Sequence, residues 1–486
     1  MLFNSIDFFL LLAITLLLYW RATTVFWRQN WLLAASLIFY AYWFPPYLLL
    51  LLALSLVAYL GGLQIAASQR AALSFTVVLL LTILGVFKYT QFSVELFNSA
   101  ASYLTIDPLL PNIPIRIPLG ISFICFQLIG YLVDVARQKI LPERSFRVFT
   151  LFISFFPQLV AGPICRAQEL IPQLTHKQSF NLDRFTGGLL LVAIGLLLKV
   201  GFADGLAPFV DSVFSSENYS SGYANQPAML AAVSFSIQIF CDFWGYSTMA
   251  VGAALLFGIE VPINFYLPYL ATSLKDFWRR WHITLSYWFR DYLYFPLGGS
   301  RQGWAITARN LIITMGLCGL WHGASLTFVI WGLMHGIYLV GERWVRSGLL
   351  ALGQADTVDQ VGPSPGWVQR VQPMRPLAGW LVTMAFVTTS WIFFRMTSLN
   401  EAVSFTQAAW NLPAGFTSEA RAMVSPGIWR LLATFVIVQV PLQRLIDAVH
   451  RHQLHISWRL VLSGWLLLLG VIMSAGESFD FIYFEF

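Results

Sequence analysis

Charged residues are scarce in this sequence. Asp, Glu, Lys and Arg make up only 11% of the 486 residues, whereas hydrophobic residues make up 58%. A soluble domain carries about 25% charged residues, and a globular core cannot grow large enough to hide so much apolar surface. The composition therefore excludes an ordinary soluble protein and predicts that the lipid bilayer is the solvent for most of the chain.

Cysteine and cofactor motifs are also few. The four cysteines lie within or beside apolar segments, without a C-x-x-C pair, so we interpret them as small buried hydrophobic residues. No pair of His, Cys, Asp or Glu has convincing metal spacing. The sequence has no Walker loop, no G-x-G-x-x-G and no G-x-S-x-G. We therefore expect no metal site and no bound cofactor.

The excess of basic residues does not indicate a nucleic-acid partner. The net charge is +6, but the basic residues lie in short loops between apolar runs. The positive-inside rule of membrane proteins explains that distribution. We expect the lipid bilayer, and not a nucleic acid, to be the main surrounding partner.

Long apolar segments recur along the whole sequence. They lie near residues 5–20, 31–44, 47–66, 72–88, 117–135, 148–165, 186–203, 228–258, 306–321, 325–341, 377–394, 429–442 and 457–474. A spanning helix needs roughly 20 apolar residues, so several segments are too short to cross the bilayer unaided. We expect an all-α polytopic membrane protein, a single membrane-embedded domain over residues 1–486. About ten to twelve transmembrane helices should be joined by re-entrant and interfacial ones.

The segment 148–165 has an unusual charge pattern. Basic residues flank it on both sides, and Pro157 and Gly162-Pro163 interrupt it. We expect it to be re-entrant with both flanks cytoplasmic, which is stable only inside protein or beside a cavity. The same analysis predicts outer loops at 89–116 and 204–227 and a linker at 345–376. The apolar N-terminus predicts a retained first span.

Residues 275–292, KDFWRRWHITLSYWFRDY, form the most unusual stretch. On one continuous helix at about 100° per residue, its large apolar side chains share a face: Trp278, Trp281, Leu285, Trp288, Phe289 and Tyr292. His282 falls at the edge of that face. This pattern is typical of an amphipathic helix in the membrane interface. The helix is either an anchor or the frame of a cytoplasmic cavity mouth that presents basic groups to an anionic donor.

His322 lies in apolar sequence, within GLCGLWHGAS at 316–325. Burying an imidazole without partners is costly, and ionisable residues in membrane segments usually face cavities and serve function. The three glycines of this stretch would allow close helix approach. His322 is therefore either a structural histidine or a functional one. His335 would lie on another face of a continuous helix, and we interpret it as structural.

Several short motifs together resemble one protein family over nearly the whole chain. They are FYAYW at 39–43, PLGISF at 118–123, FPQLVAGP at 156–163, DFWGYS at 242–247, FWRRWH at 277–282, RDYLY at 290–294, LWHGA at 320–324 and FIYFEF at 481–486. This set resembles the membrane-bound O-acyltransferase (MBOAT) family. The likeness is to its bacterial branch, which includes the alginate O-acetylation acyltransferase and the D-alanyl transfer protein of teichoic acid modification.

The resemblance implies a fold, a site and a cellular role. It implies tilted helices around a central funnel, a catalytic histidine at His322 and a second characteristic histidine at His282. It also implies that an acyl group crosses the bacterial inner membrane to a periplasmic acetyl-carrying or acetyltransferase protein of the exported-polysaccharide machinery. We expect O-acetylation of an exported polysaccharide such as alginate or cellulose.

The expected donor is acetyl-CoA or another acyl thioester presented from the cytoplasm. Lys275, Arg279 and Arg280 are candidates to bind its phosphates, with Trp281 beside them. His322 would act as general base toward an acceptor hydroxyl, although a covalent acetyl-histidine is an alternative. His282 would orient or gate the donor. The competing hypotheses are a transporter or channel for an acyl donor or small charged molecule, and a scaffold that needs neither histidine.

Overall fold

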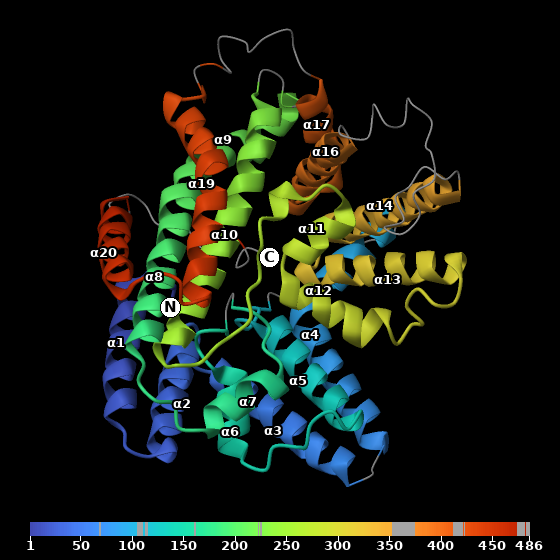
Figure 1. The fold of residues 1–486 in the computed structure, drawn as a ribbon. Helices are drawn as coiled ribbons and strands as arrows, with labels where there is room; N and C mark the ends of the chain where they lie inside the picture. The colour runs from blue at the N-terminus through green and yellow to red at the C-terminus, as the bar shows by residue number, and fades with distance from the viewer. Residues whose placement is uncertain are drawn as a thin grey trace. The chain divides into compact units, whose positions relative to one another are not determined.

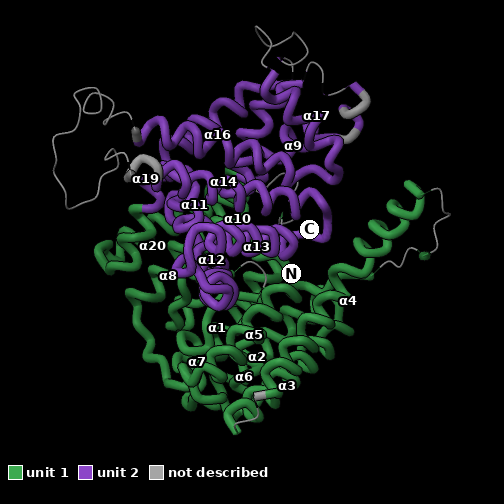
Figure 2. The backbone as a smooth tube through the Cα atoms, turned by 90° about the vertical axis from the view of Figure 1, so that its right-hand side faces the viewer, with its two compact units in different colours: residues 1–202, 241–263, 444–486 green, residues 203–240, 264–443 purple. Residues whose placement is uncertain are grey.

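The computed structural model describes the chain except residues 68–69, 105–109, 112–114, 160–161, 222, 224–225, 352–374, 412–420, 422, 474–481 and 483–486. Its described residues form helices and loops only, and they divide into two compact units (Figures 1 and 2). Unit 1 comprises residues 1–202, 241–263 and 444–486, and unit 2 comprises residues 203–240 and 264–443.

Unit 1 holds most of the N-terminal helices and the last helix. Its helices are α1 Ile6–Arg21, α2 Val25–Ala41, α3 Tyr47–Ala66, α4 Arg70–Tyr103, α5 Ile121–Ala136, α6 Phe146–Ser154, α7 Ala167–Thr175, α8 Leu182–Leu196 and α20 Ile456–Met473. A π-helix, η1 Leu197–Ala203, follows α8 without a break. Two long helices, α10 Ala228–Leu256 and α19 Pro426–His450, have residues in both units.

Unit 2 holds the segments that the sequence singled out for chemistry. Its helices are α9 Asp204–Phe214, η2 Ser216–Ser221, η3 Pro268–Leu270, α11 Leu274–Arg280, α12 Ile283–Phe289, the π-helix η4 Arg290–Tyr294, α13 Trp304–His322, α14 Leu326–Ala351, α16 Arg375–Arg395 and α17 Leu399–Trp410. Helices α13 and α14 run side by side as a hairpin (Figure 1).

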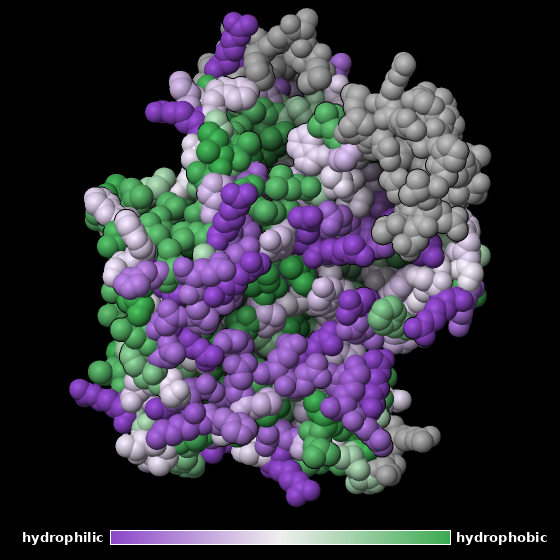
Figure 3. All heavy atoms as spheres, viewed as in Figure 1, coloured by the Kyte–Doolittle hydropathy of each residue, from purple (hydrophilic) through white to green (hydrophobic). Residues whose placement is uncertain are grey.

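The all-α polytopic membrane fold is confirmed. Six helices in the described part of the chain are long and apolar enough to cross a bilayer, and two shorter apolar helices accompany them. Large hydrophobic side chains lie exposed, such as Ile6 at 78% and Leu49 at 73%. Figure 3 shows hydrophobic patches on the visible face, with hydrophilic residues between them. Exposed apolar surface of this kind suits contact with lipid. The number of ten to twelve crossings stays a prediction.

Two predicted outer loops are largely helical. Helix α4 continues to Tyr103, inside the expected loop 89–116, and α9 continues to Phe214, inside the expected loop 204–227. Polar and acidic residues led to the loop prediction, but Asp204 is buried at the start of α9. The π-helix η1 joins α8 to α9, so residues 182–214 form one candidate span.

The predicted break in the segment 148–165 is present. Helix α6 ends at Ser154, and α7 begins only at Ala167. The nine residues of α6 are too few to span a bilayer. Its re-entrant topology stays a prediction. The expected linker at 345–376 lies mostly outside the described residues, although α14 continues into it as far as Ala351.

In unit 1, helices α8 and α10 meet along a glycine seam. A Cβ atom on Gly195 would lie 2.5 Å from the carbonyl oxygen of Gly245, so only glycine permits this approach. Close to this contact, Lys199 Nζ lies 2.9 Å from Asp242 Oδ1, with both side chains 1% exposed. The other carboxylate oxygen of Asp242 accepts the Ile482 N–H at 2.7 Å. Two opposite charges are therefore buried together beside this seam, and the carboxylate also accepts a hydrogen bond from a backbone N–H.

Candidate functional site

The hairpin of α13 and α14 carries His322 at its tip. The two helices come close because glycines face each other: a Cβ on Gly319 would lie 2.2 Å from Phe328 O, and one on Gly332 would lie 2.2 Å from Met315 O. Helix α13 ends at His322, and Gly323 follows in an extended conformation. Gly319, which the sequence analysis noted, and Gly332, which it did not, thus set the hairpin geometry around His322.

Three aromatic rings surround the His322 imidazole, which is 4% exposed. The ring centroids of Trp321, Trp331 and Phe394 lie 4.8, 5.1 and 5.3 Å from that of His322, each in an edge-to-face arrangement. An imidazole in this environment is held by packing and shielded from water.

The predicted continuous helix over 276–292 is wrong. The structure has α11, a break at Trp281 and His282, then α12 and the π-helix η4. His282 stops the helix because its backbone is left-handed, with φ +41° and ψ +56°; His tolerates this region better than most residues. Trp281, expected on an interfacial aromatic face, is fully buried instead.

Asn264 holds His282 in this conformation. The Ile283 N–H donates to Asn264 O at 2.9 Å. The side-chain oxygen Oδ1 of Asn264 accepts from Thr284 Oγ1 at 2.7 Å and lies 3.3 Å from His282 Nδ1. Because Oδ1 is an acceptor, Nδ1 carries the hydrogen and Nε2 keeps the lone pair. Burial lowers the pKa of His282 to about 3, so the imidazole is neutral at physiological pH.

The structure brings the two predicted histidines together. The Trp321 ring centroid lies 6.1 Å from that of His282 and 4.8 Å from that of His322. A single indole therefore contacts both imidazoles. The sequence placed these histidines in separate motifs, and this contact arises only from the packing of α13 against the segment around His282.

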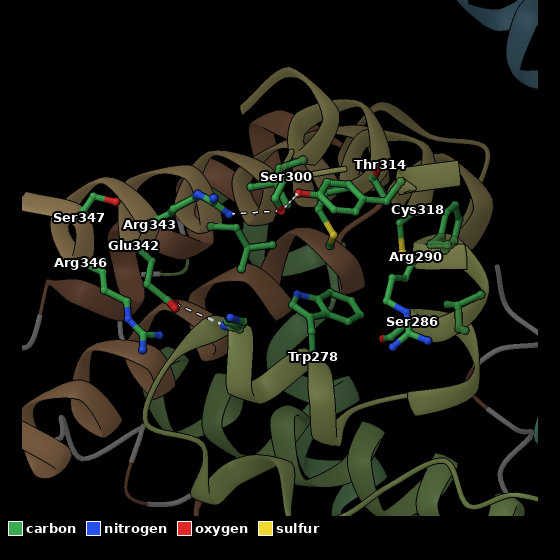
Figure 4. A pocket seen from close by; sticks show the side chains of 17 residues that line it. Trp278, Ser286, Arg290, Ser300, Thr314, Cys318, Glu342, Arg343, Arg346 and Ser347 are labelled. Carbon is green, nitrogen blue, oxygen red and sulfur yellow. Dashed lines mark hydrogen bonds between the residues drawn. The ribbon is translucent and has the colours of Figure 1, made fainter. Parts of the chain in front are cut away.

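A cavity of about 520 Å³ is lined by Ser286, in the helix that follows His282, and by Cys318, one helical turn before His322 (Figure 4). The two histidines themselves are not among its lining residues. Its walls come from α11, α12, η4, α13 and α14, all within unit 2. Figure 4 shows Arg343, Arg346 and Ser347 gathered at one end, and Cys318 and Ser286 toward the other. A cavity of this size, part apolar and part charged, suits a small ligand with one polar end.

Basic side chains gather along the cavity wall: Lys275, Arg290, Arg343 and Arg346. Arg343 donates to Ser300 Oγ at 3.4 Å, and Arg290 pairs with Asp291 at 2.7 Å. Burial, together with the charges of Arg279 and Arg346, lowers the pKa of Lys275. Figure 4 shows Arg343 and Arg346 at one end, beside Glu342, and Arg290 toward the Cys318 end. The charge of the two α14 arginines favours an anionic group at their end.

One face of α13 leads from the cavity to His322. Leu311, Thr314, Met315 and Cys318 line the cavity, and their spacing of i, i+3, i+4 and i+7 marks a single helical face. His322 continues that face, about 6 Å beyond Cys318 along the axis at 1.5 Å per residue. Helical side chains lean toward the N-terminus, so the His322 side chain leans back toward Cys318 and the cavity.

The four predicted donor-binding residues lie in different environments. Lys275 lines the cavity, whereas Arg280 pairs with Asp276 at 2.9 Å and Arg279 is exposed outside the lining residues. Trp281 packs in an aromatic core with Phe277 and other rings, at a centroid distance of 5.5 Å from Phe277. The geometry therefore brings only Lys275 of this group to the cavity.

The sequence analysis missed the arginines of α14. The sequence does contain a pattern that indicates them. Just after an apolar run, one helical face is formed by Leu339, Glu342, Arg343, Arg346 and Ser347. Arg346 and Ser347 fell within residues 345–376, which were interpreted as a linker, and Arg343 lay between that linker and the apolar run 325–341. The structure shows that α14 continues through them to Ala351.

Comparison with known proteins identifies the family. A sequence model of the membrane-bound O-acyltransferase family matches residues 18–352, which include both histidines and the whole cavity lining. The chain belongs to this family. The protein is therefore a multi-pass membrane O-acyltransferase, as the motifs predicted.

Relatives of this MBOAT protein include several named transferases. It is 37% identical over 434 residues to the probable alginate O-acetylase AlgI of Azotobacter vinelandii, covering 88% of this chain and 79% of the relative. It is 37% identical over 404 residues to the peptidoglycan O-acetyltransferase of Helicobacter pylori, covering 77% and 72%. It is 29% identical over 304 residues to the teichoic acid D-alanyltransferase of Streptococcus thermophilus, covering 58% and 72%.

Proposed function

We propose that this MBOAT protein transfers acetyl groups from a cytoplasmic thioester donor for the O-acetylation of an exported polysaccharide, and that it works in the bacterial inner membrane. The names of its alginate and peptidoglycan relatives support acetyl transfer to a glycan. One observation carries the proposal: a cavity with a basic end lies on the same face of α13 as the buried His322.

The basic end of the cavity is where we place the phosphate groups of the donor. Arg343 and Arg346 suit this role because guanidinium groups form strong charge-assisted hydrogen bonds to phosphate, and Lys275 adds a third positive charge. Acetyl-CoA is the simplest such donor, and an acetyl group on a phosphopantetheine arm has the same chemistry. The thioester would then extend along the α13 face past Met315 and Cys318 toward His322.

His322 is the group we propose as general base. It accepts the proton of an acceptor hydroxyl while that oxygen forms a bond to the thioester carbonyl carbon. The carbon–sulfur bond then breaks, and the imidazolium returns the proton to the leaving thiolate. The products are an acetyl ester and a free thiol. The rings of Trp321, Trp331 and Phe394 exclude water and keep the imidazole in place through these steps.

His282 has a supporting role in this proposal. Its buried imidazole, fixed by the hydrogen bond from Nδ1 to Asn264, acts indirectly, by orienting the groups around it. Its contact with Trp321 couples it to His322. The acceptor that receives the acetyl group is a periplasmic acetyl-carrying or acetyltransferase protein of the polysaccharide export machinery, or a small hydroxyl compound.

The test is acetyl transfer by the purified protein in liposomes. Radiolabelled acetyl-CoA and an acetylated phosphopantetheine carrier are supplied in turn, and labelled ester and released thiol are measured. The double change Arg343→Gln and Arg346→Gln should raise the donor KM about a hundredfold or more, since each hydrogen bond to a charged group contributes about 1.5–3 kcal/mol and 1.4 kcal/mol is about tenfold.

The matched control is Arg279→Gln, which removes one of the arginines that the sequence analysis favoured. Arg279 is exposed and outside the cavity, so its loss can act only through its charge near Lys275 and should change the donor KM far less than the α14 double change. A raised KM for Arg279→Gln with an unchanged KM for the α14 double variant would contradict the proposed donor site. Uptake of donor without release of thiol would instead favour a transporter.

A further inference from the structure

His335 is a buried titratable residue that the proposed chemistry does not use. It lies in α14 and is fully buried. Its Nδ1 lies 3.3 Å from Trp278 Nε1, and its Nε2 lies 3.0 Å from Ser390 Oγ. Three different helices, α11, α14 and α16, therefore meet at this imidazole. The sequence analysis interpreted it as structural.

The hydrogen bonds around His335 fix its protonation. An indole N–H can only donate, so Trp278 donates to Nδ1, and Nδ1 must carry a lone pair. The hydrogen then lies on Nε2, which donates to Ser390 Oγ, and the Ser390 hydroxyl donates onward to Val387 O at 2.8 Å. His335 is thus a neutral imidazole in a single tautomer, held at both nitrogens.

Two of the rings that contact His335, those of Trp278 and Trp331, belong to different parts of the site. Trp278 lines the cavity, as Figure 4 shows. Trp331, fully buried, lies between the two imidazoles, with its centroid 4.7 Å from that of His335 and 5.1 Å from that of His322. Trp331 also stacks on Trp391 at 5.7 Å. The His335 side chain therefore contacts both Trp278, in the cavity wall, and Trp331, the ring beside His322.

We propose that His335 is a positioning residue for acetyl transfer, holding Trp278 against the donor and Trp331 against His322. The inference rests on the proposed function, because it assumes that the donor occupies this cavity. His335 itself touches neither donor nor acceptor. A displacement of about 1 Å at a reacting group can cost about a hundredfold in rate, which gives this bracing role a measurable effect.

Three variants separate the bonds that His335 makes. His335→Leu removes both bonds and should lower kcat about ten- to hundredfold and raise the donor KM. His335→Asn can keep an acceptor near Trp278 and should retain a KM close to that of the parent. Trp278→Phe removes only the indole N–H, so it should raise KM, and its effect should not add to that of His335→Leu. The exposed His455→Leu is the matched control.

A second measurement does not depend on transfer. Reaction of His322 with diethyl pyrocarbonate, followed by peptide mass spectrometry, reports how that imidazole is held and shielded. His335→Leu should change this rate severalfold, while His455→Leu should not. If the parent protein transfers no acetyl group, the proposed function fails, and this rate alone decides whether His335 positions His322.

A purely structural role predicts a different result. His335→Leu would then lower the yield of folded protein, but the folded fraction, isolated by size exclusion, would keep the parent kcat, KM and His322 modification rate. That outcome would overturn the inference. Additive effects of Trp278→Phe and His335→Leu on KM would overturn it as well.

Discussion

Two glycine seams hold helices together in this protein, and they differ in the polar groups that they bury. In unit 1, the α8–α10 seam lies next to the Lys199–Asp242 ion pair, where opposite charges satisfy each other. In unit 2, the α13–α14 seam ends at His322, a single imidazole among aromatic rings. Close helix packing at glycine thus accompanies an ion pair in unit 1 and a histidine suited to proton transfer in unit 2.

The largest effect should follow from changing His322. His322→Ala should lower acetyl transfer by about 10²- to 10⁴-fold, the usual contribution of a general base, while the protein still inserts. No Asp, Glu, Lys or Arg occurs between residue 310 and residue 341 to take its place. His322→Gln, which keeps most of the volume, controls for loss of packing. Normal transfer by either well-expressed variant would remove His322 from the mechanism.

Changing the ion pair should affect folding rather than chemistry. Lys199→Met alone leaves the Asp242 carboxylate buried without its cation and should cost about 3–5 kcal/mol of stability. Adding Asp242→Asn removes the remaining charge, keeps an oxygen for the Ile482 N–H, and should recover much of that loss. Thermal unfolding in detergent measures both. A double variant no more stable than Lys199→Met would show that the pair has another role.

The fold class was accessible from composition and hydropathy, because the lengths and spacing of apolar runs constrain a membrane protein strongly. Helix ends were less predictable. Asp204 suggested a loop, yet it begins a helix that a π-helix joins to α8. A buried acidic residue at a helix start resembles a loop residue in sequence, and only its tertiary environment distinguishes the two.

The site was only partly predictable. The motifs pointed to His322 and His282, and the structure shows that both contact Trp321. The break at His282 could not be foreseen, because it depends on Asn264, eighteen residues earlier. The link from Trp278 through His335 to Ser390 joins three helices that are distant in sequence, and periodicity within one helix contains no information about it.

Glycine substitutions sharpen the comparison of the two seams. Gly195→Ala and Gly319→Ala each place a Cβ against a backbone oxygen, at 2.5 and 2.2 Å, and each should cost about 1–3 kcal/mol by overpacking. Only Gly319→Ala shifts the hairpin that carries His322, so only it should also lower kcat per folded molecule. Equal kcat values for the two folded variants would mean that the hairpin spacing does not position His322.

The smallest effect should come from His282. His282→Asn accommodates the left-handed backbone and should lose only the stability due to the buried imidazole's packing, while transfer should fall only partly. His282→Ala should be less stable by about 1–2 kcal/mol because alanine disfavours this conformation. The acetyl-transfer rates and unfolding temperatures of the two variants separate the effect of the backbone conformation from the effect of the lost imidazole. Full activity of His282→Asn would limit His282 to a structural role.

The most direct test of the central claim is a structure of the protein with a non-hydrolysable analogue of its thioester donor. The account predicts phosphate density beside Arg343 and Arg346, a chain that follows the α13 face past Cys318, and a carbonyl carbon close enough to His322 for an acceptor oxygen to lie between them, about 3 Å from each. A donor bound elsewhere, or one whose carbonyl points away from His322 with the cavity empty, would contradict it.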